Sequence, residues 1–154
     1  MRVGVLSVGK PERARFGPLF DDYAERLVRL GVTFDARFVA EVKAGGRYSE
    51  DHVREREAKA LDSALPERGV VVSLSPEGRT LDSIAFARKL DGWWRSRVTF
   101  VVGGPLGLDP GFMARSDLVL SLSAMTLPHE LARVLLIEQV YRAATILRGV
   151  PYHK

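Results

Sequence analysis

Cysteine is absent from all 154 residues of the sequence. This excludes disulfide bonds, thiolate metal sites and cysteine nucleophiles, and it fits a reducing compartment. No apolar run approaches the roughly 20 residues that a membrane-spanning helix needs. The first apolar stretch is too short for a secretory signal and has no small-residue cleavage pattern. We therefore expect a cytoplasmic protein without a membrane partner.

Motifs of several enzyme classes are also missing. The sequence has no GxGxxG after its first predicted strand, no Walker A motif and no GxSxG nucleophile elbow. Its three histidines are scattered, and neither HxxxH nor clustered carboxylates occur, so we expect no metal site. These absences disfavour the common dinucleotide-binding fold, P-loop nucleotide hydrolases, serine hydrolases and metalloenzymes. They also disfavour the methyltransferase fold that binds its cofactor at the first strand.

Positive charge is in modest excess, and it gathers at the C-terminal end. The formal net charge is +4, which favours a polyanionic partner only weakly. No acidic residue follows Glu138, whereas Arg142, Arg148, His153 and Lys154 do. The same cations also suit the negative end of a C-terminal helix. Charge alone leaves both interpretations open.

Apolar runs alternate with amphipathic segments along the chain. We predict strands at Arg2–Val8, Val32–Val42, Gly69–Leu74, Val98–Val102 and Leu118–Leu122. We predict helices at Glu12–Leu30, from an N-cap at Ser49 to about Leu65, and at Leu81–Trp94, Gly111–Arg115 and Glu130–Leu147. This order predicts an α/β fold, with a parallel sheet covered by helices on both faces. No repeat or linker divides the chain, so we expect a single domain over residues 1–154.

Three predicted loops follow strands in the second half of the chain: SPEGRT, GGPLGLDP and SAMTLPH. Ligands of parallel α/β sheets bind beyond the carboxyl ends of the strands, so these loops are the candidate site. In the second loop, Gly103, Gly104 and Gly107 directly follow a buried strand. Such glycines either let the backbone approach a ligand closely or form a tight turn that needs positive φ angles. The residues alone leave both interpretations open.

Three segments taken together resemble one protein family. LSPEGR is similar to a strand and loop of the form LDxxGK, and FVVGGPLG is similar to a GGxxG loop. LSLSAMTLPHELARVLLIEQVYRAATILRGVPYHK is similar to a C-terminal motif almost from end to end. The chain thereby resembles, over its whole length, the RlmH family of small SPOUT methyltransferases that act on large-subunit ribosomal RNA. It differs at Ser75, where the family often has Asp, and at Arg79, where it often has Lys.

The resemblance implies a SPOUT-type domain with a C-terminal trefoil knot, assembled as a homodimer. It implies an enzyme that uses S-adenosyl-L-methionine to methylate N3 of a pseudouridine in 23S ribosomal RNA, within the ribosome. The family has no separate RNA-binding domain, and this chain has no spare length for one. We expect phosphate contacts from scattered cations, namely Arg15, Lys43, Arg47 and Arg148, which would make RNA binding sensitive to salt.

The resemblance also implies which residues act. The cofactor-binding positions are Leu74, Ser75, Gly103, Gly104, Gly107, Leu122, Ser123, Ala124, Met125, Thr126 and Leu127. The catalytic positions are His129, Arg142, Tyr152 and His153. Pseudouridine N3 bears a proton, and histidine is suited to remove it near neutral pH, so His153 is the candidate base. Tyr152 would stack on the base or bond to it, and Arg142 would stabilise the developing anion or hold a phosphate.

Structural explanations compete with these roles. His129 could cap the last helix, Arg142 could be a charge at a helix end, and Tyr152 could only pack. Two other functions also fit the residues. The chain could be an RNA-binding or ribosome-assembly factor without enzymatic activity, or an α/β enzyme that uses GGPLG to bind a nucleotide or another small anion.

Overall fold

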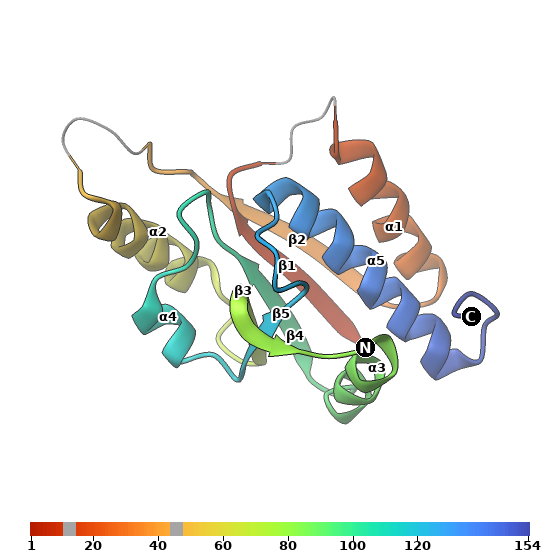
Figure 1. Ribbon diagram of the computed structural model, residues 1–154. Coiled ribbons are helices and arrows are strands. Elements are labelled where there is room, and N and C mark those ends of the chain that lie inside the picture. Colours follow the sequence, from red (N-terminus) through yellow and green to blue (C-terminus); the bar gives the residue numbers. More distant parts are fainter. Residues whose placement is uncertain (11–14, 44–47) are drawn as a thin grey trace.

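The computed structural model describes residues 1–10, 15–43 and 48–154. Its strands are β1 (Arg2–Val8), β2 (Thr33–Val39), β3 (Val70–Thr80), β4 (Arg97–Val102) and β5 (Leu118–Ser121). Its helices are α1 (Gly17–Arg29), α2 (Glu50–Ala64), α3 (Ser83–Gly92), α4 (Pro110–Ala114) and α5 (His129–Arg148). All paired strands run parallel, in the order β2-β1-β4-β3-β5 (Figure 1). The predicted parallel α/β sheet is confirmed, and the trefoil knot stays a prediction.

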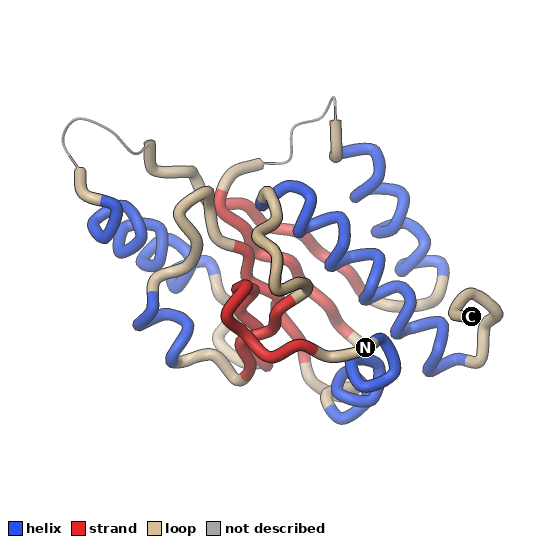
Figure 2. The backbone as a smooth tube through the Cα atoms, in the orientation of Figure 1, coloured by secondary structure: helices blue, strands red, loops and turns tan. Residues whose placement is uncertain are grey.

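Helices cover both faces of the sheet (Figure 2). On one face, Val3 of β1 and Phe100 of β4 pack in a core with Leu27 of α1, Leu90 of α3 and Ile137 of α5. These side chains are almost fully buried. Because successive residues of a strand point to opposite faces, a strand buried on both sides needs a continuous apolar sequence. The run VTFVV in β4 meets that requirement.

The second face has a smaller core. Leu6 of β1 and Val101 of β4 pack there with Leu61 of α2 and Phe112 of α4. The expectation that helices cover both faces is confirmed.

Strand β3 is longer than predicted. The segment SPEGRT, predicted to be a loop, belongs to β3, and Leu120 of β5 pairs with both Leu74 and Arg79. The residues in between bulge out before the chain returns to β5. Gly78 permits this return, because a Cβ there would lie 2.7 Å from the carbonyl oxygen of Val119. Proline and glycine are typical of turns, so the local sequence pattern alone indicated a loop.

Most helix boundaries lie within a few residues of the prediction. Ser49 is the N-cap of α2, as predicted, and its hydroxyl accepts a hydrogen bond from the backbone N–H of His52 at 3.3 Å. Helix α1 begins at Gly17 rather than Glu12, and residues 11–14 lie outside the described part of the chain. Because Pro18 has a fixed φ, it suits the first turn of this helix.

Gly149 ends α5 and reverses the chain. Its φ of 63° is left-handed, which glycine adopts without strain. The backbone N–H of Val150 donates to Thr145 O at 3.0 Å and that of Gly149 to Ile146 O at 3.2 Å, which closes the helix. The last residues therefore turn back towards α5 and α1 (Figure 1). Across residues 1–10, 15–43 and 48–154, no helix combines the length and apolarity that crossing a membrane requires.

Candidate functional site

A cavity of about 970 Å³ opens beyond the carboxyl ends of β3, β4 and β5. Its walls come from the β3 bulge, the glycine loop after β4 and the segment between β5 and α5. Of the predicted cofactor-binding residues, those that line the cavity are Leu74, Ser75, Gly103, Gly104, Gly107, Leu122, Ser123, Met125, Thr126 and Leu127. Ala124 is exposed and does not line it. Tertiary structure thus brings three separate segments together around one space.

The glycine loop is a tight turn whose backbone faces the cavity. Gly107 has a φ of +79°, and its N–H donates to Gly104 O at 3.0 Å. A Cβ on Gly103 would lie 2.7 Å from the carbonyl carbon of Gly107, and one on Gly104 would lie 3.1 Å from Glu57 Oε2. At Gly103 and Gly104, the absence of a side chain therefore serves close packing with protein atoms. The positive φ of Gly107 supports the tight-turn interpretation.

Polar side chains near the cavity shape the loops that surround it. Ser121 Oγ donates to Ser123 O at 2.9 Å, and Ser123 Oγ accepts from the N–H of Met125 at 3.0 Å. Ser75 Oγ accepts from the N–H of Glu77 at 3.3 Å. Met125 lies at the rim, with 77% of its surface exposed. The hydroxyls of two predicted cofactor-binding residues, Ser75 and Ser123, therefore already bond to nearby backbone.

His129 is the predicted catalytic residue that lines the cavity. It is the first residue of α5, and the N-cap is Pro128, where no side chain makes a capping hydrogen bond. Partial burial lowers the pKa of His129, and the positive charge of Arg133 lowers it further. The imidazole is consequently neutral at neutral pH. It therefore offers one donor and one acceptor nitrogen to the cavity.

The other predicted catalytic residues lie at the opposite end of α5. A rise of 1.5 Å per helical residue separates Arg142 from His129 by about 20 Å along the helix axis. Tyr152 and His153 lie beside Arg142, because the chain turns back after Gly149. Within one copy of the chain, these three residues do not meet the cavity.

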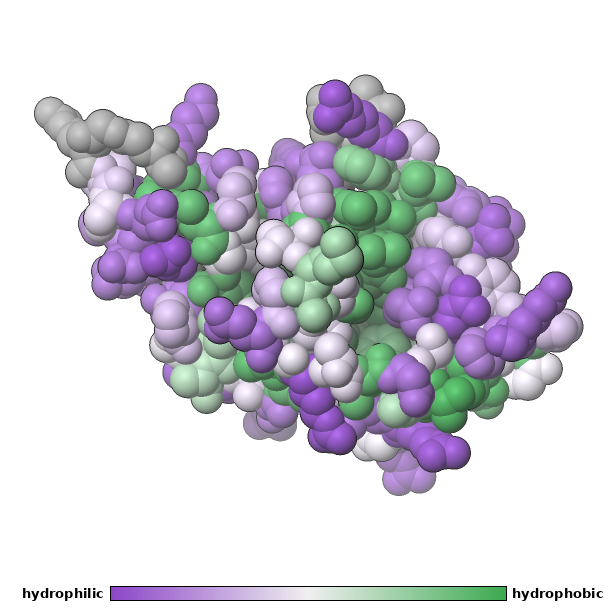
Figure 3. All heavy atoms as spheres, viewed as in Figure 1, coloured by the Kyte–Doolittle hydropathy of each residue, from purple (hydrophilic) through white to green (hydrophobic). Residues whose placement is uncertain are grey.

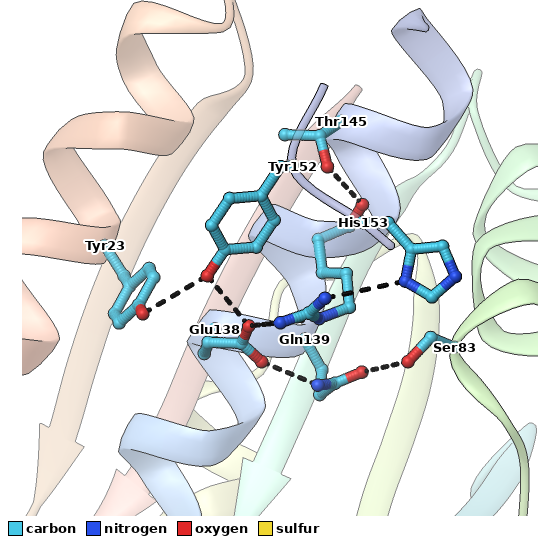
Figure 4. A network of polar contacts seen from close by, with 8 residues as sticks. Tyr23, Ser83, Glu138, Gln139, Thr145, Tyr152 and His153 are labelled. Atoms are coloured by element: carbon cyan, nitrogen blue, oxygen red, sulfur yellow. Dashed lines mark hydrogen bonds and ion pairs between the residues drawn. The ribbon is translucent and has the colours of Figure 1, made fainter. Parts of the chain in front are cut away.

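Glu138 is the centre of a polar network at this end of α5 (Figure 4). Its Oε1 accepts hydrogen bonds from Tyr152 Oη at 3.0 Å and from Arg142 Nη2 at 2.6 Å and Nε at 3.1 Å. The hydroxyls of Tyr23 and Tyr152 lie 3.4 Å apart. Burial raises the pKa of Tyr152, and hydrogen bonds to Tyr23 and Glu138 raise it further. The Tyr152 hydroxyl therefore stays protonated and acts as a donor.

Arg142 connects Glu138 to the tail. Its guanidinium lies 4.7 Å from the centre of the Tyr152 ring, and its Nη1 lies 3.5 Å from His153 Nδ1. Since a guanidinium only donates hydrogen bonds, this contact requires a lone pair on Nδ1. The Tyr152 ring also packs edge-on against Tyr141, with centroids 4.9 Å apart. Arg142 is thus more than a helix-end charge, and Tyr152 both packs and bonds.

Sequence reasoning missed Glu138, Tyr23 and Glu57. Glu138 lies four residues before Arg142, a spacing that places ion pairs on one face of a helix. Glu57 falls between Val53 and Leu61 at steps of four, where the apolar stripe of α2 predicts a hydrophobic residue. Both signals were present in the sequence. The proximity of Tyr23 to the tail had no local signal, because it depends on how α1 packs against α5.

The cations predicted to contact RNA are dispersed. Arg15 is exposed, Lys43 lines a smaller cavity, and the Arg148 guanidinium lies 5.8 Å from the Trp94 ring centre. Arg47 lies outside the described residues. Among the side chains that the structure does describe, no three His, Asp or Glu residues gather as a metal site.

Solved structures share this fold. A probable methylase family protein from Haemophilus influenzae superposes with a TM-score of 0.55 at 13% identity, covering 99% of this chain and 70% of that chain. A probable methyltransferase from Bordetella pertussis gives a TM-score of 0.51 at 16% identity, covering 93% and 96%. At such low identity the likeness concerns the fold: a parallel α/β sheet like those of these two proteins.

The sequence comparisons define the family. Residues 1–153 match the family described as "Predicted SPOUT methyltransferase". A protein named Ribosomal RNA large subunit methyltransferase H from Gemmatimonas aurantiaca is 45% identical, over the full length of both chains. Its namesake from Gluconacetobacter diazotrophicus is 46% identical, covering 97% of this chain and 95% of that protein. The chain therefore belongs to the SPOUT methyltransferase family, in the RlmH group, as the three segments taken together predicted.

Proposed function

We propose that this protein is a single-domain enzyme, formed by residues 1–154, that methylates N3 of a pseudouridine in 23S ribosomal RNA with S-adenosylmethionine. The observation that carries the proposal is the cavity at the carboxyl edge, whose walls are the three segments that resemble the RlmH family. Full-length relatives with the name Ribosomal RNA large subunit methyltransferase H support the same substrate class.

The cavity residues fit the cofactor. Its volume of about 970 Å³ lies in the range of roughly 300–1,000 Å³ that is typical of small-molecule sites. Leu74, Leu122 and Leu127 supply apolar wall for an adenine ring, and the backbone of Gly103 to Gly107 supplies polar groups beside it. The cofactor contacts that we propose are the predicted residues that line the cavity, namely Leu74, Ser75, Gly103, Gly104, Gly107, Leu122, Ser123, Met125, Thr126 and Leu127.

S-adenosylmethionine supplies an electrophilic methyl group when bound. The protein's contribution is to hold donor and acceptor in line and close together, which can supply roughly 7–11 kcal/mol of the barrier. The tight turn at Gly107 and the hydroxyl bonds of Ser121 and Ser123 keep the cavity walls in fixed positions. His129, neutral and half-buried, offers a hydrogen bond at the cavity wall.

Removal of the N3 proton falls to His153. Its side chain is exposed, and Nδ1 has the lone pair that faces Arg142. Nδ1 accepts the proton when the substrate replaces the long contact from Arg142 Nη1. Arg142 keeps its charge, because its hydrogen bonds to Glu138 raise its pKa. Because Arg142 contacts the proposed base His153, we assign to its charge the stabilisation of the anion that develops on the uracil ring. Tyr152 keeps the Arg142 guanidinium in place by lying beneath it.

In the homodimer that we propose, the tail of one copy and the cavity of the other copy form one site. Because the tail lies about 20 Å along α5 from the cavity of its own chain, the tail of one copy would complete the cavity of the other. Leu19 of α1 and Leu135 of α5 are 51% and 37% exposed. Figure 3 shows apolar residues gathered over α1 and the first half of α5. These surfaces suit a second copy of the chain. A stable, active monomer in sedimentation experiments would exclude this arrangement.

The cellular setting follows from the substrate. We propose that the dimer acts in the cytoplasm on ribosomal RNA within the ribosome, with a C-terminal trefoil knot shaping the cofactor site. RNA affinity should fall with added salt, because phosphate contacts release counterions. Arg15, Lys43 and Arg148 are the described candidates for these contacts.

One experiment tests the proposal directly. The purified protein is incubated with labelled S-adenosylmethionine and ribosomes from a strain that lacks this activity, and mass spectrometry then locates the methyl group. Methylation of N3 of one pseudouridine in 23S RNA is the expected result. Binding of S-adenosylmethionine without transfer to any RNA would refute the enzymatic role. Binding of ribosomes without binding of S-adenosylmethionine would instead support an assembly factor.

A further inference from the structure

Glu57 is a buried acid beneath the glycine loop. It lies on α2, only 3% exposed, beside the apolar residues Ala58 and Leu61. Carboxylates are rarely buried this fully unless they are paired. Its Oε1 accepts a hydrogen bond from the backbone N–H of Val42 at 3.0 Å. Its Oε2 is buried and has no hydrogen-bond partner among the described residues.

The same carboxylate packs against Gly104. A Cβ placed on Gly104 would lie 3.1 Å from Glu57 Oε2 and 3.3 Å from Oε1, tighter than ordinary contact. Val8 Cγ1 of β1 would lie equally close, at 3.1 Å, so Glu57 and Val8 together occupy the space of a side chain at Gly104. Glu57 does not line the large cavity; together with Val42 and Pro105 it lines a smaller cavity of about 300 Å³.

Arg54 forms a second contact between α2 and the loop. It lies three residues before Glu57, on the same face of the helix, and its Nη1 donates to the carbonyl oxygen of Leu106 at 3.4 Å. Asp51 and Glu50 pair with the Arg54 guanidinium from the preceding turn. Helix α2 thus contacts the loop at Gly104 and again at Leu106.

Keeping Glu57 in this place has a cost in free energy. Burial raises its pKa, the nearby Glu41 raises it further, and the bond from Val42 only partly opposes these effects. An apolar residue would fill the same stripe of α2 without an unsatisfied oxygen. Stability of the core therefore does not explain why residue 57 is an acid. The contacts of its carboxylate with the backbone of Val42 and Gly104 explain it.

We propose that Glu57 is a positioning residue for the cofactor-binding loop, fixing Gly104 against the segment that follows β2 so that the loop keeps its place in the wall of the large cavity. This inference rests on the proposed function, since it assigns S-adenosylmethionine as the ligand of that wall. The proposal also means that the segment at Val42, which does not line the large cavity, affects how tightly that cavity binds S-adenosylmethionine.

Calorimetric titration with S-adenosylmethionine tests the role of Glu57. Glu57→Ala leaves the N–H of Val42 without its acceptor and frees the loop, so we expect affinity to fall by about tenfold or more. Glu57→Gln keeps an oxygen for the Val42 N–H and should bind within about threefold of the wild type. Glu55→Ala, on the exposed side of the same helix, is the matched control and should bind as the wild type does.

A double-mutant cycle separates positioning from general stability. Gly104→Ala alone forces a methyl group towards Glu57, so it should weaken binding. In the Glu57→Ala background the carboxylate no longer opposes the methyl group, and of the neighbours within 3.3 Å only Val8 Cγ1 remains, so the added loss should be smaller than in the wild-type background. Equal losses in both backgrounds would overturn the proposal. So would wild-type affinity in a folded Glu57→Ala protein.

Hydrogen exchange on the unaltered protein gives a test that needs no variant to fold. Adding S-adenosylmethionine should slow exchange of the Gly107 amide and, through Glu57, of the Val42 amide. Slowing at Gly107 with no change at Val42 would overturn the coupling. If the wild type binds no S-adenosylmethionine at all, the proposed function fails; if it binds and Glu57→Ala binds equally well, only this inference fails.

Discussion

The two ends of α5 differ in how they are built. At its first residue, His129, the neighbouring cavity is shaped mainly by backbone: the glycine turn, the β3 bulge and the segment after β5. At its last turns, the site is made of side chains that converge on one carboxylate, Glu138. A backbone-lined cavity suits recognition of a ligand's shape and edges, whereas converging side chains suit proton transfer and charge stabilisation. Substitutions at the two ends should therefore affect different steps.

The largest effect should come from His153→Ala. Loss of the general base should lower the single-turnover rate by about 10²- to 10⁴-fold. Calorimetry should find S-adenosylmethionine affinity much less affected than the rate, because His153 acts on the proton of the RNA base and is not one of the proposed cofactor contacts. Lys154→Ala, one residue further along, is the control and should retain most of the rate. Equal losses in rate and affinity would mean that the two ends do not act separately.

Gly103→Ala should affect the other end. A Cβ would lie 2.7 Å from the carbonyl carbon of Gly107 and 2.9 Å from the N of Leu108, so the turn must open. We expect S-adenosylmethionine affinity to fall by about tenfold, as the strain of a displaced loop is of order 1–3 kcal/mol. Gly92→Ala is the matched control, because a Cβ there meets nothing within 4 Å. Wild-type affinity in folded Gly103→Ala would refute the placement of the cofactor against this loop.

Tyr152→Phe should have a smaller effect, confined to the tail. It removes the hydrogen bond to Glu138, worth about 1 kcal/mol, and so should lower Tm by roughly 2–4 °C. The turnover rate should fall several-fold, because Arg142 loses a neighbour that fixes its position. Tyr48→Phe, at an exposed site, should change neither quantity. A Tyr152→Phe protein with unchanged rate and Tm would show that the network does not order the tail.

The smallest effect concerns pH at the cavity. Burial and Arg133 lower the pKa of His129 in the folded protein, so the unfolded chain binds a proton at a higher pH than the folded chain does. Stability from this group is present above its unfolded pKa and is lost as pH falls through the folded value. When the pH is lowered from 7.5 to 5.5, the Tm of the wild type should fall by more than the Tm of the His129→Gln variant. Parallel losses would mean that His129 is not desolvated.

Local patterns predicted most of the fold. Apolar runs such as VTFVV are long enough to be buried on both faces, and the Ser49 cap is a local hydrogen bond. The β3 bulge was missed, because a strand that returns to the same partner at Leu120 depends on a distant residue rather than on its own composition. For the same reason, no periodicity in the sequence predicted the contact between Tyr23 and Tyr152.

Part of the candidate site could likewise be predicted from the sequence, and part of it could not. Its three loops could be predicted, since parallel strands end at one edge of the sheet. Glu57 and Glu138 could have been found, because each lies at an informative helical spacing. The role of Gly104 could not, because the atoms that occupy its side-chain space belong to Glu57 of α2 and Val8 of β1.

The sequence by itself determined the class of sheet, its helices, the edge of the sheet that holds the candidate site and the family. These follow from hydropathy periods and from motifs that lie within short segments. Only the tertiary structure decided that His129 lies at the cavity while Arg142, Tyr152 and His153 lie at the far end of α5. The physical reason is the rigid rise of the helix, which separates residues that the C-terminal motif places close together in sequence.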